Sequence, residues 1–157
     1  MYDETADILP IYVFERHRGT GNIGKGLIEG YGLKNGAIAS TIAHDSHNLV
    51  VIGDNPSNVK IAVQKIIDIG GGLVVVKNGE VKGCLSLDIG GIMSSKDLET
   101  VSRGHEKLNK IAMEELEINE SVNAFMTLAF MALPVIPKLK ITDKGLFDVI
   151  KFEPTSL

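Results

Sequence analysis

A nine-residue stretch rich in polar side chains, STIAHDSHN at positions 40–48, most strongly constrains how this chain can fold. Apolar residues stand on both sides of it, with Ala37 and Ile38 before and LVVI at positions 49–52 after. Short apolar runs containing β-branched residues are typical of buried strands. The sequence therefore predicts two buried strands joined by a polar turn at one sheet edge. A polar loop held by a rigid frame is a common place for a functional site.

This turn carries the densest group of chemically active side chains in the sequence: His44, Asp45, Ser46, His47 and Asn48. Histidine titrates near neutral pH and binds metals, and a neighbouring carboxylate can fix its tautomer. Three interpretations are open. The turn can be a structural network of hydrogen bonds, or a lip that contacts the active site of another domain. It can also be a metal site formed by His44, Asp45 and His47.

A second polar group, formed by Glu15, Arg16, His17 and Arg18, ends the first predicted strand. One interpretation is a solvated strand end with local ion pairs, which contribute little to stability. The other places Arg16 or His17 beside the turn, as part of the same candidate site. The sequence leaves both interpretations open.

The order of predicted elements indicates an α+β fold. Asn55 and Pro56 are typical of a helix start and Gly70 of its end, whereas Asn78 and Gly79 predict a hairpin turn. Further predictions are a strand at 11–14, a glycine-rich loop with a short helix or strand at 19–36, strands at 73–76 and 81–87, a long helix after a capping box at 94–97, a buried helix or strand at 124–133 and a closing strand at 146–152. Helices are too few for regular βαβ alternation. We therefore expect a mainly antiparallel or mixed sheet covered by helices.

Length and composition favour a single domain. The chain has 157 residues, of which 44% are hydrophobic, so we expect an N-terminal tail at 1–10 and one domain at 11–157. A net charge of −4 without a cluster of Lys and Arg argues against nucleic acid and anionic membranes as partners. The single cysteine, Cys84, is expected to be a small buried side chain in a reduced, cytoplasmic protein.

A glycine-rich string at positions 19–25, GTGNIGK, fits both the dinucleotide motif GxGxxG and most of the phosphate-binding loop GxxxxGK. Gly26 stands where such a loop needs Ser or Thr to hold Mg²⁺. The glycines that follow also disfavour the helix whose N-terminus would bind the phosphate. We expect a tight turn here, and a nucleotide-binding protein remains a less favoured alternative.

Five strings, taken together, resemble one known family. They are ERH at 15–17 with GTGNIG at 19–24, the SxxAHDSHN turn at 40–48, GGGLVVV at 70–76, FMTL at 125–128 and ALPVIP at 132–137. In this order they are similar to the C-terminal domain of bacterial and archaeal adenine deaminases, members of the amidohydrolase superfamily. The resemblance covers nearly all of the chain from about residue 8 onward.

The resemblance implies metal-dependent hydrolysis of adenine to hypoxanthine and ammonia in purine salvage, carried out by a (β/α)8 barrel. The four histidines here, His17, His44, His47 and His105, are not spaced His-x-His, and the chain is shorter than a barrel of about 250 residues. We therefore expect the barrel, its Mn or Fe and the catalytic residues to lie outside this chain. The implied partners are the barrel domain or subunit and further copies of the chain. The alternative is a free-standing binding or assembly module without catalysis.

Overall fold

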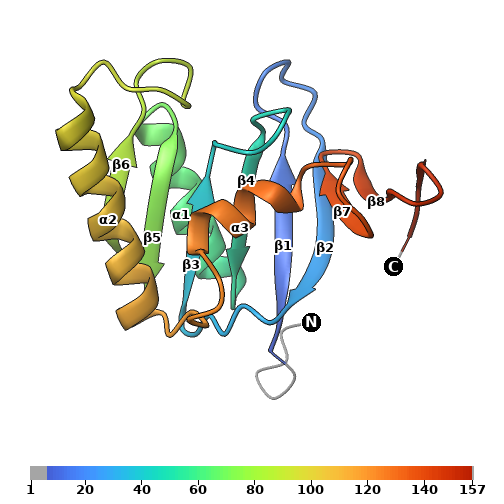
Figure 1. Ribbon diagram of the computed structural model, residues 1–157, viewed down its shortest axis with the longest axis horizontal. Coiled ribbons are helices and arrows are strands. Elements are labelled where there is room, and N and C mark those ends of the chain that lie inside the picture. The colour runs from blue at the N-terminus through green and yellow to red at the C-terminus, as the bar shows by residue number, and fades with distance from the viewer. Residues whose placement is uncertain (1–6, 157) are drawn as a thin grey trace.

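The computed structural model describes residues 7–156 and contains a six-stranded sheet with helices on both faces (Figure 1). The strand order is β2-β1-β4-β3-β5-β6, and every neighbouring pair is antiparallel. In chain order the elements are β1 Ile8–Phe14, β2 Ile23–Glu29, β3 Gly36–Ser40, β4 Leu49–Gly53, α1 Pro56–Asp68, β5 Gly72–Lys77, β6 Glu80–Ser86, α2 Leu98–Glu115, α3 Ala124–Met131, β7 Leu139–Thr142, β8 Gly145–Asp148 and β9 Glu153–Pro154. The α+β fold with a mainly antiparallel sheet is confirmed.

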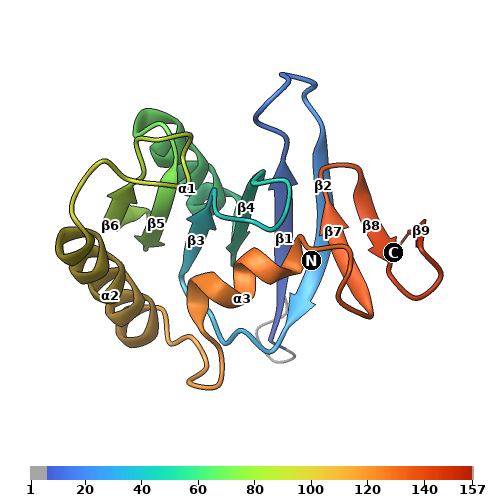
Figure 2. The ribbon, with the colours of Figure 1, turned by 45° about the horizontal axis from the view of Figure 1, so that its top comes forward.

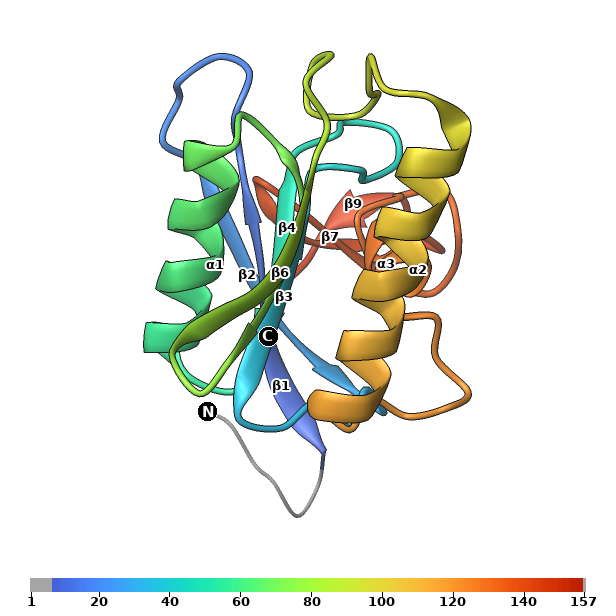
Figure 3. The same cartoon turned by 90° about the vertical axis from the view of Figure 1, so that its left-hand side faces the viewer.

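The sheet lies between two apolar layers, and its central strands are buried on both faces. α1 covers one face, and α2 and α3 cover the other (Figures 2 and 3). All residues of β3 and β4 are buried. Side chains alternate between a core with α1, such as Val51, and a core with α2 and α3, such as Ile38.

Local signals placed several element boundaries correctly. The side chain of Asn55 accepts a hydrogen bond from the amide of Asn58, and Pro56 opens α1. Asn78 and Gly79 both have positive φ, as a type I′ turn requires. The capping box before α2 was placed wrongly, because Asp97 rather than Ser94 receives the amide of the first turn.

The glycine-rich segment contains a regular strand, β2, because its glycines allow a second sheet to pack closely. A Cβ at Gly24 would lie 1.7 Å from the carbonyl oxygen of Thr142, and one at Gly26 would lie 3.0 Å from the side chain of Ile141. Both contacts come from β7, which forms a small antiparallel sheet with β8 and β9. The closing strand predicted at 146–152 is present only over its first residues: strand β8 ends at Asp148, and a turn leads to β9.

Two further expectations differ from the structure. Cys84 is exposed rather than buried, and it lies on β6, an edge strand of the sheet. β1 begins at Ile8, inside the tail expected at 1–10, while residues 1–6 lie outside the described part of the chain. Within residues 7–156, no helix is both long and apolar enough to cross a membrane.

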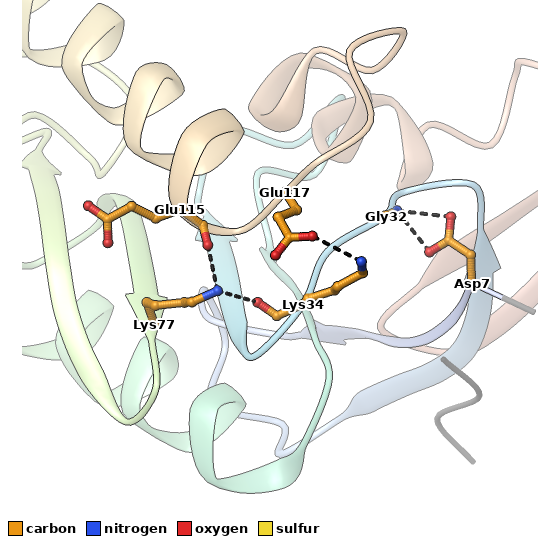
Figure 4. Close-up of polar contacts among 6 residues, drawn as sticks. All are labelled: Asp7, Gly32, Lys34, Lys77, Glu115 and Glu117. Carbon is orange, nitrogen blue, oxygen red and sulfur yellow. Dashed lines mark hydrogen bonds and ion pairs between the residues drawn. The ribbon is translucent and has the colours of Figure 1, made fainter. Parts of the chain in front are cut away.

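Lys77, at the C-terminal end of β5, holds the C-terminus of α2 against the strands (Figure 4). The ammonium of Lys77, on β5, donates to the carbonyl oxygen of Glu115 at 2.5 Å and to that of Lys34 at 3.2 Å. A cation at a helix C-terminus also interacts favourably with the helix dipole. The ion pair between Lys34 and Glu117, at 2.9 Å, lies beside this contact.

We predict that Lys77→Met lowers the free energy of unfolding by about 1 to 2 kcal/mol, because two carbonyl oxygens lose a charged donor. Urea denaturation followed by circular dichroism measures the change. Lys107→Met, on the exposed surface of α2, is the matched control and should change stability by less than about 0.5 kcal/mol. Equal stability of the two variants would contradict the role of Lys77.

Candidate functional site

Three loops meet at the strand ends drawn at the top of Figure 1. They are the β1–β2 turn at 15–22, the β3–β4 loop at 41–48 and the β6–α2 loop at 87–97. β1, β3 and β6 end at this edge, and β4 and β5 begin there, because neighbouring strands are antiparallel. The predicted polar turn between two buried strands therefore lies where the sequence placed it.

The β3–β4 loop is closed by hydrogen bonds of His47. Its amide donates to the carbonyl oxygen of Ala43 at 2.6 Å, and its Nδ1 accepts from the amide of Ala43 at 3.3 Å. Since Nδ1 is an acceptor, the proton of the neutral ring lies on Nε2. The hydroxyl of Ser46 accepts from the amide of Asn48 at 3.3 Å. The loop thus presents a half-buried imidazole with a defined tautomer.

The structure brings Arg16 and His17 to this loop. Arg16 Nε donates to the carbonyl oxygen of His47 at 2.6 Å, and Arg16 Nη2 donates to that of Gly90 at 2.7 Å. His17 Nε2 lies 2.8 Å from the carbonyl oxygen of Ser46. One guanidinium therefore joins all three loops, which is more than a solvated strand end with local ion pairs.

The turn that follows β1 is organised around Glu15. Its carboxylate accepts from the amides of His17, Arg18 and Thr20 at 2.5 to 3.0 Å and from the Thr20 hydroxyl at 3.2 Å. Hydrogen bonds from the amides of Thr20, Arg18 and His17 lower the pKa of Glu15 to about 2. Glu15 is consequently a structural anion at neutral pH.

Asn48 and Asp143 connect the loop to the small sheet. Asn48 Nδ2 donates to one oxygen of Asp143 at 3.4 Å, and Asn22 Nδ2 donates to the other at 3.3 Å. Asn48 Oδ1 is buried and has no hydrogen-bond partner among residues 7–156. These residues border a polar cavity of about 540 Å³ that Lys144 and His17 also line. Asp143 could not be assigned to this site from the sequence, because it lies 95 residues from Asn48.

Thr41 links the β3–β4 loop to the β6–α2 loop and to the start of β5. Its hydroxyl donates to the carbonyl oxygen of Gly91 and accepts from the amide of Gly72 at 2.7 Å. A Cβ at Gly71 would lie 2.6 Å from Gly91 Cα, so two glycine-rich segments pack backbone to backbone. The repeated glycines at 70–72 and 90–91 were the available signal for this contact, and the sequence reasoning did not use it.

His44 and Asp45 are the loop residues with the fewest side-chain partners. The ring of His44 packs edge-on against Phe130 of α3, with ring centroids 5.0 Å apart, and its amide donates to the Ala129 carbonyl oxygen. Asp45 is exposed, and its carboxylate makes no hydrogen bond or ion pair with any residue between 7 and 156. These two side chains are available to an external group.

The loop is not arranged to hold a metal ion. His47 Nδ1 is occupied by the Ala43 amide and the proton of the neutral ring lies on Nε2, so neither ring nitrogen offers a lone pair to a metal. No three His, Cys, Asp or Glu side chains in the described range are grouped as metal ligands. The metal-site interpretation of His44, Asp45 and His47 therefore does not fit this donor set.

The glycine-rich string at 19–25 does not form a phosphate-binding loop. It runs from a turn directly into strand β2, where Lys25 pairs with Tyr12 of β1. A phosphate-binding loop needs a helix N-terminus at this point. The geometry is that of a hairpin.

Burial lowers the pKa of His47, and the positive charges of His44, Arg16 and His17 lower it further, while Asp45 opposes them. A histidine with a depressed pKa is held neutral in the folded state. This matches the acceptor role of Nδ1.

Comparison with known proteins gives a consistent result. Residues 1–153 match the family described as the adenine deaminase C-terminal domain. The chain is 54% identical over 153 residues to adenine deaminase 2 of Carboxydothermus hydrogenoformans, which covers 96% of this chain and 27% of that protein. It is 48% identical over 143 residues to adenine deaminase of Clostridium acetobutylicum, covering 91% of this chain and 25% of that protein. The chain spans about a quarter of the length of the curated relatives it matches.

We predict that lowering the pH destabilises the wild type more than His47→Gln. The unfolded chain takes up a proton near pH 6.5, whereas His47 in the folded state does so only at lower pH. Its contribution to stability is thus complete above pH 6.5 and declines as the pH falls towards the lowered pKa. Melting temperatures between pH 8 and 5 measure this. Identical slopes for His47→Gln and wild type would exclude the effect.

Proposed function

Because the chain belongs to the family of adenine deaminase C-terminal domains, we propose that it is the C-terminal part of an enzyme that hydrolyses adenine to hypoxanthine and ammonia. The observation that carries this proposal is the match over residues 1–153, together with identities near 50% to adenine deaminases. The relatives are about four times as long as the matched region. In this proposal, an amidohydrolase barrel in the remaining part, or in a separate subunit, carries the reaction.

The hydrolytic chemistry belongs to the barrel. In this proposal the barrel would hold a divalent metal, Mn or Fe, whose chemistry would be the activation of the water that hydrolyses adenine. The donor set of the β3–β4 loop does not fit a metal, so we assign the loop a contacting role instead. Oligomer formation through this domain remains a prediction from the family resemblance.

We propose that the β3–β4 loop is a lip that meets the substrate side of the barrel. His47 offers a neutral Nε2–H donor, and Asp45 offers an exposed carboxylate acceptor, the two kinds of group that recognise a purine edge. Arg16, His17, Ser46 and Asn48 hold the loop through the contacts described above. The loop is thus both a structural network of hydrogen bonds and a lip that contacts the barrel, which are two of the three interpretations left open by the sequence.

The sharpest test is Asp45→Ala in the intact enzyme, meaning this chain together with the barrel. Because the Asp45 carboxylate makes no hydrogen bond or ion pair within residues 7–156, the variant should keep its melting temperature. A lip predicts a fall in kcat/KM for adenine on the order of tenfold or more. Adenine loss followed in the ultraviolet gives the rate. Glu120→Ala, an exposed acid near the opposite sheet edge, is the control and should leave both quantities unchanged. Normal turnover by Asp45→Ala would exclude the lip.

The family-level proposal is tested separately. The purified 157-residue chain, supplied with Mn²⁺ or Fe²⁺, should not turn over adenine, whereas the intact enzyme should. Sustained turnover by the chain alone, after removal of contaminating enzyme, would contradict the assignment of the chemistry to the barrel. An intact protein without adenine hydrolysis would refute the proposed function itself.

A further inference from the structure

On the sheet face that carries α1, two of the six strands, β1 and β2, extend beyond the helix. Antiparallel pairing places Tyr12 beside Lys25 and Phe14 beside Ile23 on this face, opposite the buried Val13. We call it the β1–β2 face, and its residues are Pro10, Tyr12, Phe14, Ile23, Lys25 and Leu27. α1 packs against β3, β4, β5 and β6, and in Figure 1 it lies behind the strands to the left of β1 and β2. Ile23 and Leu27 are 45% and 44% exposed.

A groove continues this face along α1 to the candidate site. A hollow of about 320 Å³ lies between β1 and α1, and a second of about 280 Å³ lies at the upper sheet edge. Phe14 and Val63 line both hollows, so the two adjoin at these side chains, and together they are called the groove. The second hollow ends at Arg16, whose guanidinium holds the β3–β4 loop. A body seated in this groove therefore lies against Arg16, which holds the β3–β4 loop.

The charges of this surface restrict what can cover it. Lys25 lies between Ile23 and Leu27 on β2, and Lys60 lies on α1; both are exposed, and neither has an ion-pair partner within residues 7–156. Apolar centres with a polar rim are typical of interfaces between proteins or domains. A covering body with apolar side chains bordered by carboxylates fits this surface. A second copy of the chain would present the same apolar face with the same two lysines.

We propose that the β1–β2 face and its groove are the docking surface for the barrel, which presents an apolar patch bordered by carboxylates. This inference rests on the proposed function. β1 is the first strand of the domain, so a preceding domain in the same polypeptide would be joined to this hairpin. The relatives carry about three quarters of their length outside the matched region, enough to cover the surface. Docking here would place the barrel against the groove that leads to Arg16 and the lip.

Hydroxyl-radical footprinting with mass spectrometry tests the contact directly. It compares the 157-residue chain alone with the intact enzyme that contains it. Labelling of Ile23 and Leu27 should be about threefold or more lower in the intact enzyme, as expected for exposed side chains that become an interface centre. Val81, 38% exposed on the far edge strand β6, is the reference and should be labelled equally in both. Equal labelling of Ile23 and Leu27 in the two samples overturns the proposal.

A pair of variants gives a second readout. Leu27→Glu places a carboxylate in the apolar centre, so labelling of Ile23 in the intact enzyme should return to the level of the chain alone. Val81→Glu adds the same charge at a comparably exposed position and should leave Ile23 protected. Because Leu27 is half exposed, the melting temperature of the chain alone should not change in either variant. Full protection of Ile23 in Leu27→Glu overturns the proposal.

Two controls separate this inference from its alternatives. Light scattering of the chain alone and of its Leu27→Glu variant should give the same mass, because this face is not expected to join two copies. A dimer that Leu27→Glu converts to monomers would assign the face to a second copy and overturn the proposal. Adenine turnover tests the proposed function, and footprinting tests the contact between the barrel and the β1–β2 face. An intact protein with adenine turnover but an unprotected face would refute only the docking surface, and protection without turnover would refute only the function.

Discussion

The antiparallel pairing of β3 between β4 and β5 is the constraint on which the candidate site depends. Ile38 pairs with Ile52 on one side and with Val75 on the other, and all three side chains are fully buried. Complete burial of such a side chain contributes about 1.5 to 3 kcal/mol. A shift of the register by one residue would turn these side chains to the other face of the sheet. The buried pairs therefore fix the level at which β3 ends and β4 begins, and with it the position of the His44–His47 segment.

The sequence predicted those parts of the fold whose signals are short in range. Asn55 with Pro56 and Asn78 with Gly79 act through their own backbone conformations and neighbouring amides, so their roles could be seen without knowledge of the fold. Gly24 and Gly26 favoured a loop by intrinsic propensity, yet they lie in β2. The close approach of β7 explains this, and such an approach leaves no local trace in the sequence.

The candidate site shows the same contrast between local signals and contacts of distant segments. The polar turn stood out because its residues are consecutive. Asp143, Gly90 and Phe130 belong to other loops or helices, and they reach the turn only because the sheet and α3 bring them there. Cys84 shows the corresponding limit for burial, since an edge strand and a central strand have similar composition when read alone.

The hydrogen bonds of Arg16 to His47 and Gly90 have a thermodynamic consequence for the loops around it. Two loops that share one guanidinium do not open independently, because displacement of either breaks a charged hydrogen bond that orients the other. Their fluctuations are therefore correlated. A molecule that orders one loop reduces the entropy still to be lost when the other becomes ordered. Positive cooperativity between contacts at the lip and contacts at the β6–α2 loop follows, without any change in the average structure.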